Sequence, residues 1–209
     1  MSSPYRLQPA IQITSPRASP YSTSDSITIN YAVSDALSGI EASSATLDGA
    51  PVTKGQVINL AAMAGNHKFT LVALDKAGNQ APSSIDFVVS VAAAVDIDPD
   101  TLNPKGQGGK NAFTAYIEFP PGYDVGQINV ATVKLTVNGT AIPAQLSPTN
   151  VGDYDSDRIA DRMVKFDRQA VIAALGSASG DITMTVSGSL NDGRGFMGSD
   201  VIKVLDKGK

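Results

Sequence analysis

The chain of 209 residues contains no cysteine and no tryptophan, and it has a single histidine, His67. The lack of cysteine excludes disulfide bonds and thiolate metal sites. One histidine is too few for a multi-histidine zinc site, and no nucleophile or carboxylate lies close to it in the sequence for a catalytic triad. His67 precedes a strand-like segment, so we interpret it as a structural residue.

Glutamate is almost absent as well, because only Glu41 and Glu118 stand against 18 aspartates. Glutamate favours helices, whereas aspartate favours turns, helix caps and sites for hard metal ions. Together with 19 glycines and 12 prolines, this balance predicts a β-rich protein. The two glutamates fall in different halves of the chain, and we interpret both as surface or edge carboxylates rather than as a glycosidase pair.

A basic surface and a long apolar run are also missing. The net charge is −4, which argues against nucleic acid as a partner. No run of about 18 apolar residues occurs, so we expect no membrane span. Residues 1–6 lack the apolar core of a signal peptide. If the protein works outside the cell, we therefore expect this chain to be a segment of a longer one.

What the sequence does contain is a succession of short alternating segments. Residues 26–33 place four side chains on one face of a strand: Ile27, Ile29, Tyr31 and Val33. Asp48-Gly49 and Asn138-Gly139 are two-residue hairpin signals. Asp167 and Gly176 bound one short helix, Arg168–Leu175. The sequence thus predicts an all-β fold with two tandem β-sandwich domains, residues 1–91 and 92–209, and one short helix in the second.

Several segments of the first domain form a recognisable set. They are Tyr31-Ala-Val-Ser-Asp35 with Ser38-Gly39, Ala45-Thr-Leu-Asp-Gly49, Gly65-Asn-His67 with Phe69, Leu71 and Ala73, and Asp75-Lys-Ala-Gly-Asn79. In these segments the domain resembles a bacterial immunoglobulin-like domain. The resemblance implies a sandwich that serves as a spacer or adhesive module in surface and secreted proteins, and it implies no chemistry.

One segment of the second domain points to a specific chemistry. Four aspartates lie within nine residues: Asp153, Asp155, Asp157 and Asp161. Carboxylates so close repel one another unless a cation lies among them, and a flexible set of oxygen ligands suits Ca²⁺ better than Mg²⁺. We expect side-chain oxygens from all four, with the carbonyl oxygen of Ile159, to bind the ion. The alternative is a solvated acidic turn, because Asp, Ser and Arg are common in turns.

The loop departs from an EF-hand. Arg158 stands at position six, where glycine permits a sharp turn, and Val164 stands at position twelve, where a bidentate glutamate belongs. No helical pattern precedes the loop, and residues 162–166 alternate like a strand. We therefore expect a calcium loop between strands, with an affinity of about 10⁻⁴ to 10⁻³ M. Water or another carboxylate, such as Asp167, would complete the ligand set.

The second domain has its own set of recognisable segments. They are Ile97-Asp-Pro-Asp100 with Leu102-Asn-Pro-Lys105, Val130-Ala-Thr-Val-Lys-Leu135, Asp153 to Asp161 with Val164, Phe166 and Gln169, and Leu190, Asp192-Gly193, Gly198-Ser-Asp200 and Ile202. In these segments the domain resembles a recurrent module of bacterial and archaeal secreted proteins, in which glycine usually replaces Arg158. The resemblance implies calcium binding and an extracellular location.

Three further segments carry weaker signals. Asp96, Asp98 and Asp100 lie at the joint between the domains and are candidates for a second metal site. Residues 106–110 are glycine-rich but lack the spacing of a phosphate-binding loop, so a flexible loop is expected. Asn138-Gly139-Thr140 is a formal glycosylation sequon, which the hairpin explains better.

These patterns predict a non-catalytic, calcium-stabilised pair of modules, a monomeric spacer or adhesive element of a secreted or cell-surface prokaryotic protein. Besides calcium, its partner would be an extracellular polysaccharide or a surface protein. The alternative is a carbohydrate-binding module attached to a secreted hydrolase or protease. Without tryptophan, the aromatic surface for stacking would come from Tyr116, Tyr123 and Tyr154. An enzyme is the least favoured class, because the usual nucleophile, base and metal constellations are missing.

Overall fold

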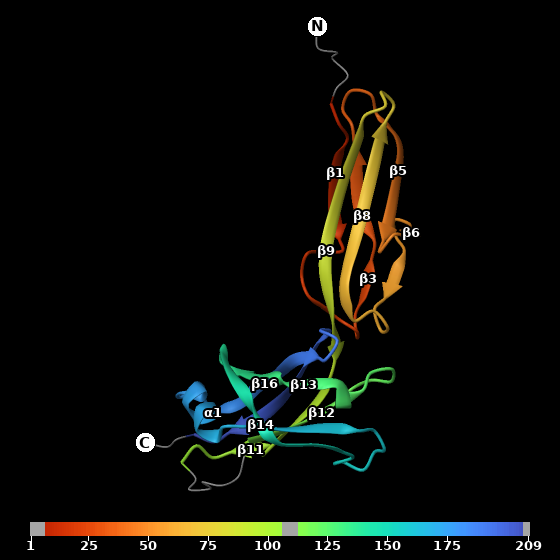
Figure 1. Cartoon of the computed structure of the whole chain (residues 1–209). Helices are drawn as coiled ribbons and strands as arrows, with labels where there is room; N and C mark the ends of the chain where they lie inside the picture. The colour runs from red at the N-terminus through yellow and green to blue at the C-terminus, as the bar shows by residue number, and fades with distance from the viewer. Residues whose placement is uncertain (1–6, 106–112, 207–209) are drawn as a thin grey trace. The chain divides into compact units, whose positions relative to one another are not determined.

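The computed structural model describes residues 7–105 and 113–206 (Figure 1). The chain folds into two compact units, Met1–Ser90 and Val91–Lys209. The described secondary structure is β-strand except for one α-helix, α1 (Arg168–Leu175), and one 3₁₀ turn, η1 (Val125–Gln127). The expected all-β fold with one short helix is confirmed. The glycine-rich segment 106–110 lies outside the described residues.

Unit 1 is a two-layered β-sandwich. Its strands are β1 (Ala10–Ser15), β2 (Tyr21–Ser22), β3 (Ser26–Thr28), β4 (Asn30–Ser34), β5 (Ile40–Leu47), β6 (Ala50–Val52), β7 (Val57–Asn59), β8 (Gly65–Asp75) and β9 (Gln80–Ala92), whose last two residues belong to unit 2. One layer has the order β6-β5-β8-β9, with β2 added in parallel on β9. The other layer consists of the pairs β1-β4 and β3-β7. This arrangement is an immunoglobulin-like sandwich.

The strand expected at residues 26–33 is interrupted at Ile29. The interruption arises because the chain changes partner there, from β7 beside β3 to β1 beside β4. Ile29 keeps its backbone hydrogen bonds, since its N–H donates to the Gln56 carbonyl at 2.9 Å and its carbonyl accepts from Gly55 at 2.8 Å. The predicted alternation survives the change, because Ile27 and Ile29 are both buried.

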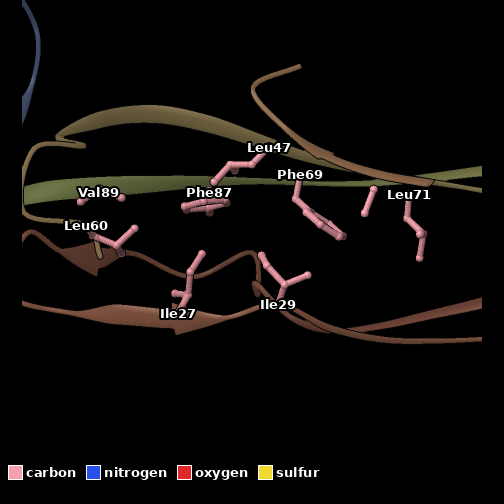
Figure 2. Close-up of a cluster of buried hydrophobic side chains, with 9 residues drawn as sticks. Ile27, Ile29, Leu47, Leu60, Phe69, Leu71, Phe87 and Val89 are labelled. Atoms are coloured by element: carbon pink, nitrogen blue, oxygen red, sulfur yellow. The ribbon is translucent and has the colours of Figure 1, made fainter. Parts of the chain in front are cut away.

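The core of unit 1 lies between the two layers. Figure 2 shows Ile27 and Ile29 of one layer projecting toward Phe69 and Phe87 of the other. Phe69 is fully buried, and it packs beside the partly buried ring of Tyr31 at a centroid distance of 6.3 Å. Burying an aromatic side chain of this size contributes roughly 1.5–3 kcal/mol of stability. The hydrophobic contact across the layers is thus what holds this unit together.

Unit 2 is also built from two sheets. Its further strands are β10 (Ala94–Asp98), β11 (Thr101–Leu102), β12 (Phe113–Glu118), β13 (Ile128–Val137), β14 (Thr140–Gly152), β15 (Asp161–Phe166), β16 (Gly180–Leu190) and β17 (Gly195–Val204). One sheet has the order β10-β12-β15-β14, and the other has the order β14-β13-β16-β17 with β11 on β17. β14 takes part in both, pairing with β13 through residues 140–143 and with β15 from residue 144 onward.

The two sheets of unit 2 are also joined at their other margin. Residues 91–92 and 101–102 pair in parallel with β17, while the intervening β10 pairs with β12. Gly198 makes the close approach feasible, because a Cβ there would collide with the Ala93 carbonyl oxygen and with Val95. The Ile97 N–H donates to the Asp200 carboxylate at 2.8 Å, which fixes β10 beside β17. The sandwich is therefore closed along both sides.

Helix α1 forms as the sequence predicts. The Asp167 carboxylate accepts the Ala170 N–H at 2.8 Å as the N-cap, and Gly176 ends the helix at a φ of 58°. The side-chain amide of Asn138 lies near the last carbonyls, 3.4 Å from the Leu175 oxygen. The hairpin signal Asn138-Gly139 therefore also contributes to the C-terminal end of the helix. No helix in the described ranges has the length and apolar character needed to cross a bilayer.

Candidate metal centre

The strand register of unit 2 gathers acidic side chains on one outer face. β10, β12 and β15 are adjacent, and Glu118 is paired with both Ala94 and Asp161, whereas Asp96 is paired with Tyr116. Paired residues on neighbouring strands point to the same side of a sheet. Asp96, Glu118 and Asp161 therefore share one face, and alternate residues such as Ile97, Ile117 and Val164 fill the core on the other.

Residues 153–160 connect β14 to β15 and bring further carboxylates to this face. Each of the four predicted aspartates accepts one backbone N–H from within the segment. The pairs are Tyr154 to Asp161 at 2.9 Å, Arg158 to Asp153 at 3.2 Å, Asp157 to Asp155 at 3.1 Å and Ile159 to Asp157 at 2.7 Å. The Tyr154 ring packs on Tyr116 of β12, with 4.8 Å between the ring centroids. The loop is thereby held against the sheet.

The result is an acidic cluster, which we define as Asp96, Glu118, Asp153, Asp155, Asp157 and Asp161. Carboxylate oxygens of Asp153, Asp155 and Asp161 all lie within 4.8 Å of one another. A second group with the same spacing joins Asp155 and Asp157 to Glu118. Two oxygens on opposite sides of a calcium ion are about 4.8 Å apart, given Ca–O distances of about 2.4 Å. Either group of three could therefore share one cation.

The electrostatics of the cluster are unfavourable without a cation. Burial, followed by the negative charges of Asp157, Asp161 and Asp155, raises the pKa of Glu118. Burial also raises the pKa of Asp96, with repulsion from Asp200, Asp100, Asp98 and Asp155 adding to it. Within residues 7–105 and 113–206, no Lys or Arg forms an ion pair with the cluster. The negative charge is thus left uncompensated by the cationic side chains that the structure describes.

Two arginines adjoin the cluster in sequence and neither neutralises it. Arg162 points to the other side of β15 and donates from Nη2 to the Gly126 carbonyl at 3.3 Å. Arg158 adopts a φ of 77°, the left-handed conformation that glycine adopts most readily. Arginine at position six of the loop therefore keeps the backbone turn for which glycine is usually needed. Its exposed side chain belongs to no ion pair in the described part of the chain.

A small cavity adjoins the cluster. It has a volume of about 150 Å³ and is lined by Asp96, Tyr116, Tyr154, Asp155 and Asp161. A neighbouring cavity of about 140 Å³ is lined by several of the same residues together with Glu118. Water occupies about 30 Å³ in the liquid, so the space accommodates a cation with several water ligands. Asp161, which is only 5% exposed, is the most buried residue of the acidic cluster.

The structure brings some of the residues predicted from the sequence together and places others elsewhere. Asp153, Asp155 and Asp161 meet in one group, and Asp157 belongs to the other. The side chain of Ile159 is 42% exposed, and its N–H bonds to Asp157. The Asp167 carboxylate caps α1. Glu118 and Asp96 join the cluster against expectation, because the sequence indicates an ordinary surface or edge carboxylate for the first and a separate site for the second.

The other candidates have different surroundings. His67 lies in unit 1, with Nδ1 2.7 Å from Asp48 and Nε2 2.5 Å from the Met63 carbonyl. Its ring also packs on Phe87 at 5.4 Å, which is consistent with a structural role. Of the three tyrosines, Tyr123 contacts Arg194 and not the tyrosine pair at the cluster. The tyrosine pair has one exposed ring, Tyr154, at 44%.

Comparisons with known proteins give structural neighbours but no family. Neither a family model nor a curated protein matches the chain. Fibronectin(III)-like modules of CbhA from Clostridium thermocellum align over 95% of this chain and 94% of theirs, with 16% identity and a TM-score of 0.36. SGBP-B from Bacteroides ovatus, solved with a mixed-linkage heptasaccharide, aligns over 94% of this chain and 47% of its own, with 14% identity and a TM-score of 0.28.

A third neighbour is a Ca²⁺-stabilised adhesin with which an Antarctic bacterium binds ice. It aligns over 95% of this chain and 49% of its own, with 16% identity and a TM-score of 0.30. At TM-scores below 0.5 these likenesses assign neither a fold nor a function to this chain. Its function must be inferred from its own residues.

Proposed function

We propose that unit 2 binds a calcium ion between residues 153–160 and the outer face of β12 and β15. The observation that supports this most directly is that two sets of three acidic residues, both of which include Asp155, bring their carboxylates together. Among the described residues, no cationic side chain forms an ion pair with them. Carboxylates in contact with one another cost free energy unless a cation compensates them. The acidic cluster is therefore more stable with a divalent ion than without one.

The ligand chemistry favours calcium. All candidate ligands are oxygens, and Ca²⁺ accepts six to eight of them in flexible geometry, whereas Mg²⁺ requires a near-ideal octahedron. Asp153, Asp155 and Asp161 provide the first three, and the Ile159 carbonyl is the backbone candidate. Glu118 approaches from β12 and could replace the glutamate that the loop itself lacks at position twelve. Water would complete the coordination.

The ion would have a structural role. It would neutralise the neighbouring negative charges that, after burial, raise the pKa of Glu118, and it would fasten the loop to the sheet. An affinity of about 10⁻⁴ to 10⁻³ M matches calcium concentrations outside cells. We therefore propose a calcium-stabilised, non-catalytic module pair that acts as a spacer or adhesive element of a secreted or cell-surface protein.

Thermal unfolding with and without calcium tests the proposal. With 10 mM calcium and this affinity, we expect about 1.4–2.7 kcal/mol of added stability, visible as a higher Tm than in EDTA. The double variant Asp155→Ala/Asp157→Ala should lose this increase. The control Asp86→Ala/Asp181→Ala, which removes two exposed carboxylates outside the cluster, should retain it. An identical melting curve in EDTA and in calcium would exclude the proposal.

Terbium luminescence provides a second test that does not depend on stability. Tb³⁺ replaces calcium at oxygen sites, and a nearby tyrosine transfers excitation energy to it. The Tyr154 and Tyr116 rings line the same cavity as Asp155 and Asp161. We expect sensitised emission that calcium displaces, and we expect most of it to disappear in Tyr154→Leu. Emission that the Asp155→Ala/Asp157→Ala variant retained would place the ion elsewhere.

A further inference from the structure

A cavity of unit 1 lies where β3 passes into β4, and the charge of its lining is opposite to that of the acidic cluster. It has a volume of about 430 Å³, within the range of ligand pockets. Its lining includes two cations, Arg17 and Lys54, and three neutral polar side chains, Thr14, Thr28 and Asn30. No carboxylate lines it. We call this the basic cavity.

Local irregularities in the strands open this cavity. The β1-β4 register shifts between Ile13 and Ser15, so that Thr14 is not paired. Next to Asn30, which pairs with Ser15, the chain changes partner at Ile29. Thr14 donates from Oγ1 to the Asn30 carbonyl at 3.1 Å, and Arg17 donates from Nε to the Thr14 carbonyl at 3.4 Å. These bonds hold the rim of the cavity in place.

The two cations of the basic cavity have no carboxylate partner among the described residues. Neither Arg17 nor Lys54 forms an ion pair in the part of the chain that the structure describes. Lys54 lies over the face of the Tyr31 ring, with Nζ 5.9 Å from the centroid, which keeps the ammonium beside the cavity. The chain as a whole carries a charge of −4, so a cavity with two cations and no acid departs from the general charge of the molecule.

We propose that the basic cavity binds an acidic sugar residue of a polysaccharide, through a ring-borne carboxylate or sulfate group. The guanidinium of Arg17 is suited to a bidentate contact with such a group, and Lys54 adds a second positive charge. The hydroxyls of Thr14 and Thr28 and the amide of Asn30 are suited to the neutral hydroxyls of a sugar ring. A nucleic acid is less suitable, because it requires a longer basic surface than two cations provide.

This binding activity is independent of the calcium site, which lies in unit 2, and the two proposals can fail separately. Acidic polysaccharides bind calcium themselves, so the assay uses the full chain in EDTA at low salt. Affinity electrophoresis would compare polygalacturonate, chondroitin sulfate and neutral dextran. We expect retardation by at least one anionic polymer and none by dextran, with retardation weakening as salt rises.

Matched variants assign the binding to the basic cavity. Arg17→Gln/Lys54→Gln should lower the affinity about tenfold or more, because it removes both charge-assisted contacts. Lys68→Gln/Lys76→Gln removes the same charge from exposed positions of unit 1 outside the cavity and should change the affinity less than about twofold. Arg17→Lys should give an intermediate loss, since the charge remains and the bidentate geometry does not.

Several results would overturn the proposal. These are no binding of either anionic polymer, equal binding of dextran, equal binding of a single-stranded DNA of similar length, or an equal loss in the two double variants. Binding of polygalacturonate would show that a carboxylate is sufficient for recognition, and binding of chondroitin sulfate without binding of polygalacturonate would show that the sulfate is needed.

Discussion

The aspartates of the two units are used in different ways. In unit 1, one oxygen of Asp35 accepts three backbone N–H groups, from Leu37, Ser38 and Gly39 at 2.6–3.1 Å, and the Ser38 hydroxyl at 2.9 Å. Asp75 is 1% exposed and accepts the Ala77 and Asn79 N–H groups and the Asn79 amide. In the loop of unit 2, each aspartate accepts a single N–H, and the carboxylates face one another.

Hydrogen-bond donors also decide the direction of the pKa shifts of Asp35 and Asp75. The hydrogen bond from the Ser38 backbone is the largest influence on Asp35 and, with the neighbouring donors, lowers its pKa despite desolvation. Burial raises the pKa of Asp75, but the hydrogen bonds from Asn79, Ser38 and Ala77 outweigh it and leave the pKa lowered. The pKa values of Asp96 and Glu118 in unit 2 are raised. In unit 1, several donors from the same turn thus stabilise each carboxylate, although the second oxygen of Asp35 is buried and has no hydrogen-bond partner among the described residues. In the loop of unit 2, each aspartate has one such donor.

The largest expected effect comes from breaking unit 1 alone. Phe69→Ala removes a fully buried ring and should destabilise this unit by about 3–5 kcal/mol. Because the acidic cluster lies within unit 2, the calcium-dependent rise in Tm should persist in this variant. Calorimetry with and without calcium would measure both. If the Phe69→Ala variant also lost the calcium-dependent rise in Tm, calcium binding in unit 2 would depend on the folding of unit 1.

A smaller effect is expected from Asp167, the aspartate of unit 2 that caps helix α1. Asp167→Ala removes the N-cap of α1 and should cost about 0.5–2 kcal/mol. The increment in stability due to calcium should be unchanged, because this carboxylate is bonded to Ala170. Urea unfolding in EDTA and in calcium gives the two free energies. A smaller calcium increment in the variant would instead make Asp167 a ligand.

The two units should respond differently to pH when metal is absent. A carboxyl whose pKa is raised by folding binds protons more tightly in the native state, so unit 2 should gain stability from Glu118 and Asp96 as the pH falls from 7 to about 5. The folded-state pKa values of Asp35 and Asp75 are lowered, so these carboxylates stabilise unit 1 at any pH above their pKa in the unfolded chain. That contribution is lost only below about pH 4. In melting curves recorded in EDTA, the Tm of unit 2 should rise as the pH falls from 7 to about 5, and the Tm of unit 1 should fall only below about pH 4.

The smallest effect is expected from Glu118→Gln, which should be favourable without metal and unfavourable with calcium. Without metal, Glu118→Gln should raise the Tm slightly, because it removes a half-buried charge beside Asp155, Asp157 and Asp161. With calcium, the same variant should bind the ion more weakly if Glu118 is a ligand. Glu41→Gln is the matched control and should do neither. A variant that lowered the Tm in EDTA would contradict the repulsion inferred for the cluster.

The local features of this fold could be read from the sequence, and the non-local ones could not. The Asp48-Gly49 and Asn138-Gly139 turns and the Asp167 cap depend on neighbouring residues, and each forms as predicted. The interruption at Ile29 depends on the choice between β7 and β1 as partner, which no local pattern specifies. The division of β14 between two sheets is non-local for the same reason.

The candidate site shows the same limit. The four aspartates of the loop are close in sequence, so their proximity in space was predictable. Glu118 and Asp96 join them only through the register of β12 with β15 and of β10 with β12, across sequence separations that alternation alone does not resolve. Asp35, which accepts three backbone N–H groups at one oxygen, likewise looks no different in sequence from Asp155, which accepts one. What separates them is the number of N–H groups that each turn directs at its carboxylate.

Calorimetry of the full chain in EDTA and in 10 mM calcium tests the central claim most directly. Two transitions are expected, and the Phe69→Ala variant identifies the one that belongs to unit 1. Calcium should raise the transition of unit 2 by the equivalent of about 1.4–2.7 kcal/mol and leave that of unit 1 in place. If calcium changed the Tm of neither transition, or raised the Tm of unit 1 as much as that of unit 2, the contrast between the aspartates of unit 1 and the aspartate loop of unit 2 would be wrong.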